Sequence, residues 1–382
     1  MILSRTININ DIRIELSEYG NPTGTKEWFA FLHVSDIRKS FREQMADITA
    51  SLQCLFEEYM NDTTCIMARC HVSDAANQTN AIEKELKDII AGTITIVQQP
   101  PLDGTKIALG IYAVDNTGRV SSYNGQTEME HNGYIHLWTT AKGKSDTDTY
   151  NQTTAMFEDY CNHIATKGMN IKDNCMRTWL YVNDIDNNYT DVVRGRNDVF
   201  DKKGLTEETH FIASTGIAGY SGIKGTNVVL ETYSVKGLLP EQIRFLYATS
   251  HMNRTSDYGV RFERGVSITY GDRTQAFISG TASINNKGKI LYTGDIQKQT
   301  ERMWENVGQL LKETDMTLDD DVMQMTIYLR DMADYTVTKE LFDKRFPHTP
   351  KLILHAPVCR PGWLIEMECI CIKDNQCTFN VF

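Results

Sequence analysis

Residues 352–372 read LILHAPVCRPGWLIEMECICI, and the fold is most readily inferred from this stretch. Two apolar runs, LILHA and WLIEMECICI, have the composition of β-strands, and residues 359–362 between them have that of a turn. Alternation along the second run places Glu366 and Glu368 on the same face. A carboxylate in so apolar a strand is costly unless it is paired, protonated or catalytic, which makes Glu366 the first candidate for a functional residue.

The composition is that of a globular protein with more than one core. A chain of 382 residues predicts two or three domains. The net charge of −11 and the lack of a lysine-rich tract argue against nucleic-acid binding. Neither a signal peptide nor a membrane-spanning run is recognisable, so we expect a cytoplasmic protein with no membrane partner.

Cysteine and histidine spacing gives no indication of a metal site. The nine cysteines include no CxxC pair, and the nine histidines show no ligand spacing. Reduced, mostly buried thiols are the simplest interpretation. We therefore predict neither a structural zinc nor a catalytic metal.

The sequence contains an internal repeat. Residues 150–200 align with residues 297–346, and a weaker copy lies at the N-terminus. Matching residues fix the register, the last pair after one inserted residue: Thr153 with Thr300, Phe157 with Trp304, Met169 with Met316, Asp184 with Asp331, and Tyr189 with Tyr335. We predict three units, at residues 1–117, 118–237 and 238–382.

Each unit is predicted to be about β-β-α-β-α-β-β, an α+β arrangement with helices on one face of an antiparallel-leaning sheet. The expected strands before the helices are residues 7–16, 133–140 and 275–284. Paired strand blocks close the units at residues 93–114, 211–235 and 352–372. In the first unit we expect helices at residues 41–59 and 81–90. Asp184 and Asp331 follow a strand and are candidate caps of the next helix.

The unit resembles the Rid (YjgF, endoribonuclease L-PSP) family, which has a chorismate mutase-like fold. The resemblance is carried by FISGTASIN, QKQTERMWENVGQLL, VMQMTIYLRDMADY and LIEMECI in the last copy. Members form homotrimers with sites in the clefts between subunits, so three copies in one chain imply a monomeric, covalent pseudo-trimer. The deaminases of the family use an arginine where this chain has Leu352, which disfavours imine deamination.

Residues 130–382 also resemble the chorismatase family. The resemblance rests on ASTGI (213–217), YGVRFERG (258–265), ISGTAS (278–283), GDxxxQT (294–300) and VCRPGWLIEME (358–368). Within these motifs Glu263 and Gly265 are unusual. The resemblance implies an enzyme without a cofactor that cleaves chorismate and releases pyruvate. It implies that Glu366 protonates the enolpyruvyl methylene, and that a cysteine at Cys359 accompanies formation of an aromatic hydroxybenzoate.

A small anionic substrate such as chorismate, a dicarboxylate, requires cations and close backbone approach. Arginines 177, 194, 196, 261, 264 and 360 are candidates, each with surface charge or a structural ion pair as the alternative. The small residues of ISGTAS and ASTGI mark close approach either to a ligand or to a crossing strand. The candidate substrate-binding residues are Arg177, Tyr189, Arg196, Thr215, Gly216, Arg264, Ser279, Gly280, Thr281 and Ala282.

The candidate catalytic residues are Glu366 and Cys359. A desolvated Glu366 has a raised pKa and can act as a general acid, whereas the alternative is a buried glutamate paired with an arginine, with Glu368 as the rival acid. For Cys359 the alternative is an ordinary buried thiol. The predicted reaction yields pyruvate with a hydroxybenzoate, 3-hydroxybenzoate being favoured, or a dihydroxy-cyclohexadiene carboxylate. A Rid-type enamine/imine deaminase and a non-catalytic metabolite-binding protein are the alternatives.

Overall fold

The computed structural model describes residues 2–20 and 24–382. The α+β prediction is confirmed, because the chain forms three six-stranded sheets with helices. The first sheet and its helices, the N-terminal repeat, comprise β1 (Ile2–Ile9), β2 (Ile12–Tyr19), β3 (Glu27–Val34), α1 (Phe41–Glu58), β4 (Thr63–Val72), α2 (Ala75–Leu86), β5 (Thr93–Gln98) and β6 (Ile107–Asp115).

The other two sheets follow in the chain. The middle repeat comprises β7 (Arg119–Tyr123), β8 (Gln126–His131), β9 (Tyr134–Lys142), α3 (Thr149–Thr166), α4 (Ile171–Asn174), β10 (Cys175–Val182), α5 (Ile185–Lys202), β11 (Ala213–Ala218) and β12 (Val228–Lys236). The last repeat comprises β13 (Ile243–Leu246), β14 (Gly265–Thr269), β15 (Arg273–Ala282), α6 (Ile296–Lys312), β16 (Val322–Leu329), α7 (Tyr335–Arg345), β17 (Lys351–His355) and β18 (Ile365–Asp374), with short 3-10 helices at Pro240–Gln242, Thr255–Tyr258 and Met332–Asp334. The predicted unit boundaries after residues 117 and 237 stay predictions.

All three sheets have the same topology, as a repeat requires. Their strand orders are β1-β2-β3-β6-β4-β5, β7-β8-β9-β12-β10-β11 and β13-β14-β15-β18-β16-β17. The pairs β4–β5, β10–β11 and β16–β17 are parallel, because the second helix of each repeat connects them as a crossover. The other pairs are antiparallel, as predicted for most of the sheet.

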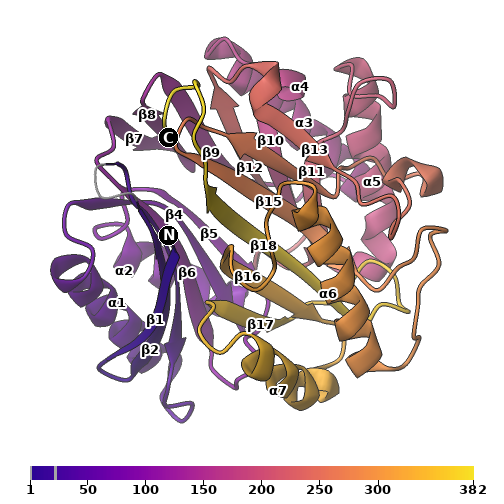
Figure 1. The fold of residues 1–382 in the computed structure, drawn as a ribbon. Coiled ribbons are helices and arrows are strands. Elements are labelled where there is room, and N and C mark those ends of the chain that lie inside the picture. The colour runs from indigo at the N-terminus through magenta and orange to yellow at the C-terminus, as the bar shows by residue number, and fades with distance from the viewer. Residues whose placement is uncertain (1, 21–23) are drawn as a thin grey trace.

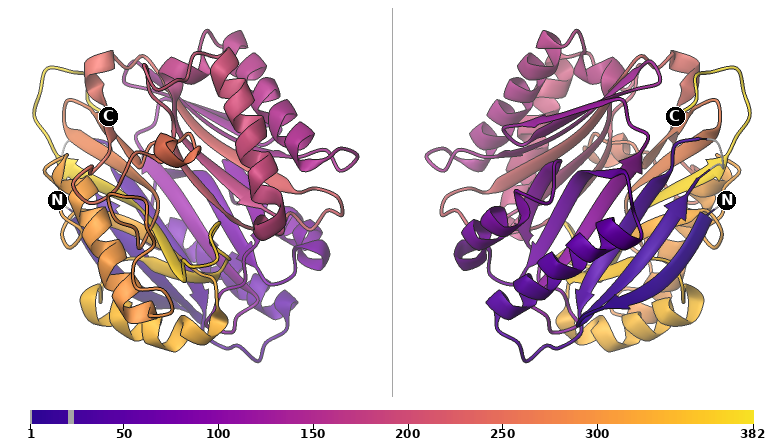
Figure 2. Two further views of the ribbon diagram at one scale, coloured as in Figure 1. Left: turned by 90° about the vertical axis from the view of Figure 1, so that its right-hand side faces the viewer. Right: turned by 90° about the vertical axis from the view of Figure 1, so that its left-hand side faces the viewer.

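The three repeats form a closed ring, the predicted pseudo-trimer. Their helices lie on the outside and their sheets face a common centre (Figures 1 and 2). The fifth strand of each repeat contacts the next repeat: Thr93 Oγ1 lies 2.7 Å from Thr127 Oγ1, Ser214 N donates to Ser279 Oγ at 2.9 Å, and Lys351 N donates to Glu15 Oε2 at 2.8 Å. The central hydrophobic cluster accordingly contains side chains from all three repeats. Whether the chain is a monomer stays a prediction.

Several local predictions were wrong for identifiable reasons. Each repeat has three strands before its first helix, and residues 7–16 contain a hairpin turn at Asn10, whose φ is +52°. The predicted paired strands β17 and β18 are not neighbours, because β16 lies between them. The helix expected at residues 81–90 is α2, which begins six residues earlier at Ala75. Asp184 precedes α5 with φ of +46° and makes no side-chain cap hydrogen bond, whereas Asp331 caps a 3-10 turn before α7.

A buried ionic cluster joins the N-terminal repeat to the last repeat. Glu27 is fully buried and accepts hydrogen bonds from Arg273 Nη1 at 2.7 Å, Gln275 Nε2 at 2.7 Å and Tyr112 OH at 2.9 Å. Arg273 is also fully buried and bonds Asp272. Breaking one member of such a cluster leaves a desolvated charge without full compensation. In the described part of the chain no helix is long and apolar enough to cross a membrane.

We predict that Glu27→Gln lowers the free energy of unfolding by about 3 kcal/mol, because Arg273 loses its carboxylate partner in the N-terminal repeat. Urea denaturation followed by circular dichroism measures the loss. The matched control is Arg38→Gln, since Arg38 pairs with Asp36 on the surface, where solvent screens the pair and its loss should leave stability nearly unchanged. Equal stability of the two variants would contradict a structural role for the buried pair.

Candidate active site

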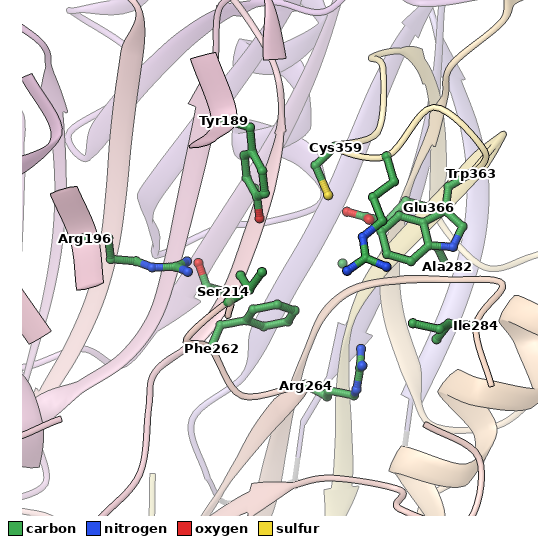
Figure 3. Close-up of a pocket in the computed structure, with 14 residues that line it drawn as sticks. Tyr189, Arg196, Ser214, Phe262, Arg264, Ala282, Ile284, Cys359, Trp363 and Glu366 are labelled. Carbon is green, nitrogen blue, oxygen red and sulfur yellow. The ribbon is translucent and has the colours of Figure 1, made fainter. Parts of the chain in front are cut away.

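A pocket lies in the cleft between the middle and last repeats. It encloses about 550 Å³ of atom-free space, part of it open to solvent. Tyr189 and Arg196 enter from one side, and Arg264, Cys359 and Glu366 enter from the other (Figure 3). Its lining residues are Tyr189, Arg196, Ser214, Gly216, Val260, Phe262, Arg264, Gly280, Ala282, Ile284, Cys359, Arg360, Trp363 and Glu366.

The pocket is built where strand ends of two repeats meet a helix. Helix α5 presents Tyr189 and Arg196, one helical face of that amphipathic segment, and β11 contributes Ser214 and Gly216. An added Cβ at Gly216 would lie 2.9 Å from the Tyr189 ring, so glycine is needed there for the ring to pack on the strand. The middle repeat thus lines one side of the pocket with the Tyr189 ring, the Arg196 guanidinium and the strand segment that contains Gly216.

The last repeat supplies the acid. Glu366 lies near the start of β18 opposite Ala282 of β15, and it is 5% exposed. Burial raises the pKa of Glu366, and the nearby Glu368 carboxylate raises it further, while Arg177 and Arg264 lower it; the result is about 8. Glu366 is therefore a protonated acid at neutral pH, as the sequence-based hypothesis requires of a general acid.

Gly280 makes room for this carboxyl. The register between β15 and β18 shifts between Ile278 and Thr281, a bulge that contains Gly280. An added Cβ at Gly280 would lie 2.1 Å from Glu366 Oε1 and 3.0 Å from Thr215 Cγ2. The small residue predicted here is therefore required by close approach of the Glu366 side chain and of a strand from the middle repeat.

Three arginines surround the pocket. Arg264 is 5% exposed and donates from Nε and Nη2 to the Asn253 carbonyl at 3.1 and 3.0 Å. Arg196 is 2% exposed, and the Arg360 guanidinium lies 4.9 Å from the centre of the Trp363 ring. Such a set of guanidinium groups favours an anionic ligand. Within residues 2–20 and 24–382, no group of three or more His, Cys, Asp or Glu side chains is placed to hold a metal ion.

Cys359 lies in the loop between β17 and β18, beside Tyr189 and Glu366. Burial raises the pKa of the Cys359 thiol to about 12, with a further contribution from the Glu366 carboxyl, while Arg360 and the Tyr189 hydroxyl act in the opposite direction. The thiol is therefore neutral at physiological pH and is not a nucleophilic thiolate. Its position makes it a wall of the pocket next to the acid.

The predicted site residues divide into two groups. Those that line the pocket are Tyr189, Arg196, Gly216, Arg264, Gly280, Ala282, Cys359 and Glu366. The others do not line it. Arg177, Thr215 and Ser279 are buried in the contact between the middle and last repeats, where Arg177 and Thr215 bond Glu368, and Thr281 is buried within the last repeat. Strand crossing describes Thr215 and Ser279, which lie where the two repeats meet. Gly216 and Gly280 are required by close packing against Tyr189 and Glu366, and close approach to a ligand at these two glycines stays a prediction.

Sequence reasoning missed several lining residues. Phe262, Ile284, Val260 and Trp363 are apolar, and their residue type carries no chemical signal. Ser214 sits inside the ASTGI motif beside two residues that were predicted, so the motif itself could have indicated it. Arg360 carries the same signal as the other five candidate arginines, so the sequence does not single it out.

Comparison with known proteins identifies the family. The family described as Endoribonuclease L-PSP matches residues 265–373. A RutC family protein of Pyrococcus abyssi is 32% identical over 100 residues, which cover 26% of this chain and 78% of that protein. The chain belongs to the RutC family. A RutC family protein of Drosophila melanogaster is 30% identical over 113 residues, covering 27% of this chain and 75% of that protein.

The likeness to a chorismatase extends beyond a single repeat of this RutC family member. A chorismatase crystal structure matches with a TM-score of 0.63 at 18% identity, over 81% of this chain and 93% of that one. At this identity the likeness concerns the fold. The shared family and fold agree with the resemblances predicted from the motifs of the last and middle repeats.

We predict that Gly280→Ala destabilises the protein by about 1–3 kcal/mol, because the new methyl group must displace the Glu366 carboxyl or the Thr215 side chain from a packed contact. Denaturant unfolding measures the change. Gly308→Ala in α6 is the matched control: apart from the nearby backbone of its own helix, no atom lies within 4 Å of its added Cβ, and alanine should stabilise that helix by about 0.5–1 kcal/mol. Changes of the same sign in both variants would contradict the described contact.

Proposed function

We propose that the chain is a chorismatase-like enzyme that cleaves the enolpyruvyl ether of chorismate to pyruvate and a ring carboxylate. One observation carries the proposal: a buried acid, Glu366, is held protonated in a pocket lined by Arg196, Arg264 and Arg360. The likeness in fold to a chorismatase supports the same assignment. A dicarboxylate with an acid-labile ether is a substrate that such a pocket suits.

The proposed reaction begins with protonation of the alkene of the substrate by the acid. Glu366 donates its proton to the methylene carbon of the enol ether, which leaves an oxocarbenium ion and the Glu366 carboxylate. Water, or a hydroxyl group of the substrate, adds to the cation and returns a proton to Glu366. The water adduct is a hemiketal, and its collapse breaks the ether bond and releases pyruvate and the ring alcohol. The arginines bind the two substrate carboxylates and position the alkene against the acid.

We expect Cys359 to face the ring of bound chorismate and therefore to influence which ring product is formed beside pyruvate. As a neutral thiol beside Glu366 it excludes water from one side of the pocket without attacking the substrate. Exclusion of water favours trapping of the cation by a substrate hydroxyl, which forms a cyclic ketal. Loss of a ring proton, with cleavage of the ring carbon–oxygen bond of that former hydroxyl, aromatises the ring, and the remaining hemiketal collapses to pyruvate and 3-hydroxybenzoate. Addition of water would instead give the dihydroxy-cyclohexadiene carboxylate.

A Rid-type deaminase is the second candidate, and the residue at one position of another cleft disfavours it. Leu352, at the position of the deaminase arginine, lies in the cleft between the last and N-terminal repeats, with Arg13, Glu15 and His33. An aliphatic side chain there cannot bind the substrate carboxylate. Ammonia release from 2-aminoacrylate without pyruvate release from chorismate would favour the deaminase. Chorismate binding without turnover would favour a metabolite-binding protein.

We predict that purified protein releases pyruvate from chorismate, and that Glu366→Gln lowers kcat by about 10²–10⁴-fold, because glutamine keeps the shape of the side chain and lacks the acidic proton. Coupled detection of pyruvate measures the rate, and circular dichroism controls for folding. A fully active Glu366→Gln variant would transfer the role of acid to another group.

We predict that Cys359→Ala keeps pyruvate release and shifts the ring product from 3-hydroxybenzoate toward the dihydroxy-cyclohexadiene carboxylate, because the smaller side chain admits water. Chromatographic separation of the two ring products measures the ratio. Cys377→Ala, at an exposed thiol that does not line the pocket, is the control and should leave the ratio unchanged. An unchanged ratio in Cys359→Ala would exclude this role for the thiol.

A further inference from the structure

Glu368, two residues beyond Glu366 on the same face of β18, is surrounded by hydrogen-bond donors. It is 6% exposed. Arg177 Nη2 lies 2.8 Å and Thr215 Oγ1 2.5 Å from its Oε2, and Trp179 Nε1 lies 3.0 Å from both oxygens. Tyr328 OH lies 3.1 Å and Arg69 Nη1 3.7 Å from its Oε1.

These neighbours require the ionised form of Glu368. Arginine and tryptophan side chains can only donate, and a protonated carboxyl would present a donor where donors already converge. Two guanidinium groups supply compensating charge. Glu366, in contrast, has no hydrogen bond to any described residue and lies among apolar and cationic lining groups. Two carboxyls on one strand face are therefore held in opposite protonation states.

Thr215 connects the ionised carboxylate to the backbone beside the acid. Its hydroxyl donates to Glu368 and accepts from Arg177 Nη2 at 2.5 Å and from Gly280 N–H at 2.8 Å. Gly280 is the bulge residue against which the Glu366 carboxyl lies. The position of this backbone is thus fixed by a chain of hydrogen bonds that ends on Glu368.

The charges that face Glu366 come from several elements. Glu368 of β18 opposes its ionisation, whereas Arg177 of β10 and Arg264, which precedes β14, favour it. Cys359 faces it as a neutral thiol, and Arg360 and Arg196 line the same pocket. Burial favours the protonated form of Glu366, whereas the nearby arginines favour its carboxylate, so the two effects oppose each other. The negative charge of Glu368 adds to the effect of burial and favours the protonated form of Glu366.

We propose that Glu368 is a positioning residue of the site, which keeps Glu366 protonated by its own negative charge and fixes, through Thr215, the Gly280 backbone against which the Glu366 carboxyl rests. The inference deepens the proposed function, on which its kinetic consequence rests. Glu368 itself contacts no substrate-facing space of this pocket.

Infrared titration of Glu366 tests the electrostatic part without any substrate. The protonated carboxyl band is assigned by its loss in Glu366→Gln. In Glu368→Gln we expect the titration midpoint of Glu366 to fall by about one pH unit or more. Glu231→Gln is the matched control, since Glu231 is equally buried and pairs with Arg69 and Tyr181 without reaching Thr215. Its Glu366 midpoint should equal that of the wild type.

Arg177→Met should shift the titration midpoint of Glu366 in the direction opposite to that of Glu368→Gln. Removal of this cation should raise the Glu366 midpoint, whereas general loosening of the core would move both variants in the same direction. A folded Glu368→Gln variant with the wild-type midpoint overturns the proposal. If that variant does not fold, an unchanged or lowered midpoint in Arg177→Met overturns it.

Kinetics test the backbone part. Thr215→Val removes the acceptor of Gly280 N–H and should lower kcat for pyruvate release by about ten- to a hundredfold with little change in KM, and Thr215→Ser should restore it. The alkaline limb of the kcat profile should move to lower pH in Glu368→Gln, in step with the infrared midpoint. Wild-type kcat in Thr215→Val overturns the backbone role. Absence of pyruvate release from the wild type overturns the proposed function and leaves the infrared result decisive for Glu368.

Discussion

The carboxylate of Glu368 is the interaction on which the rest of the structure depends. It binds Arg69 of the N-terminal repeat, Arg177, Trp179 and Thr215 of the middle repeat, and Tyr328 of its own repeat. A buried charge is tolerable only when every partner is in place, so this contact fixes how the three sheets meet. The pocket lies directly beside it and inherits its geometry from the same strands.

The candidate site depends on a contrast between adjacent carboxyls. Glu366 and Glu368 differ little in burial, yet donors converge on Glu368 and none of the described residues donates to Glu366. Burial raises the pKa of Glu366, and no hydrogen bond from a described residue offsets this effect, whereas donors converge on Glu368. Gly280 and Gly216 then allow the acid and the Tyr189 ring to approach the strands of the other repeat.

Sequence reasoning recovered the features that repeat or alternate along the chain. The internal repeat, the α+β class and Glu366 could be predicted because an apolar strand makes one carboxylate conspicuous. The insertion of β16 between β17 and β18 could not, because strand order is decided by contacts distant in sequence. Thr215 and Gly216 carry the same signal as neighbours in one motif, yet strand alternation turns one into the interior and the other toward the pocket. Phe262 and Trp363 resemble any other core residue.

The unequal repeats also have a consequence for the axis of the ring. The strand positions paired with Thr326, Trp179 and Arg69 carry Glu368, Glu231 and Gly110, and a single guanidinium, Arg69, contacts both glutamates. An assembly of three identical subunits with glutamate at this position would gather three carboxylates on the axis and would have no room for one shared cation. Joining the copies in one polypeptide lifts this constraint, because each copy can then carry a different charge at the shared centre.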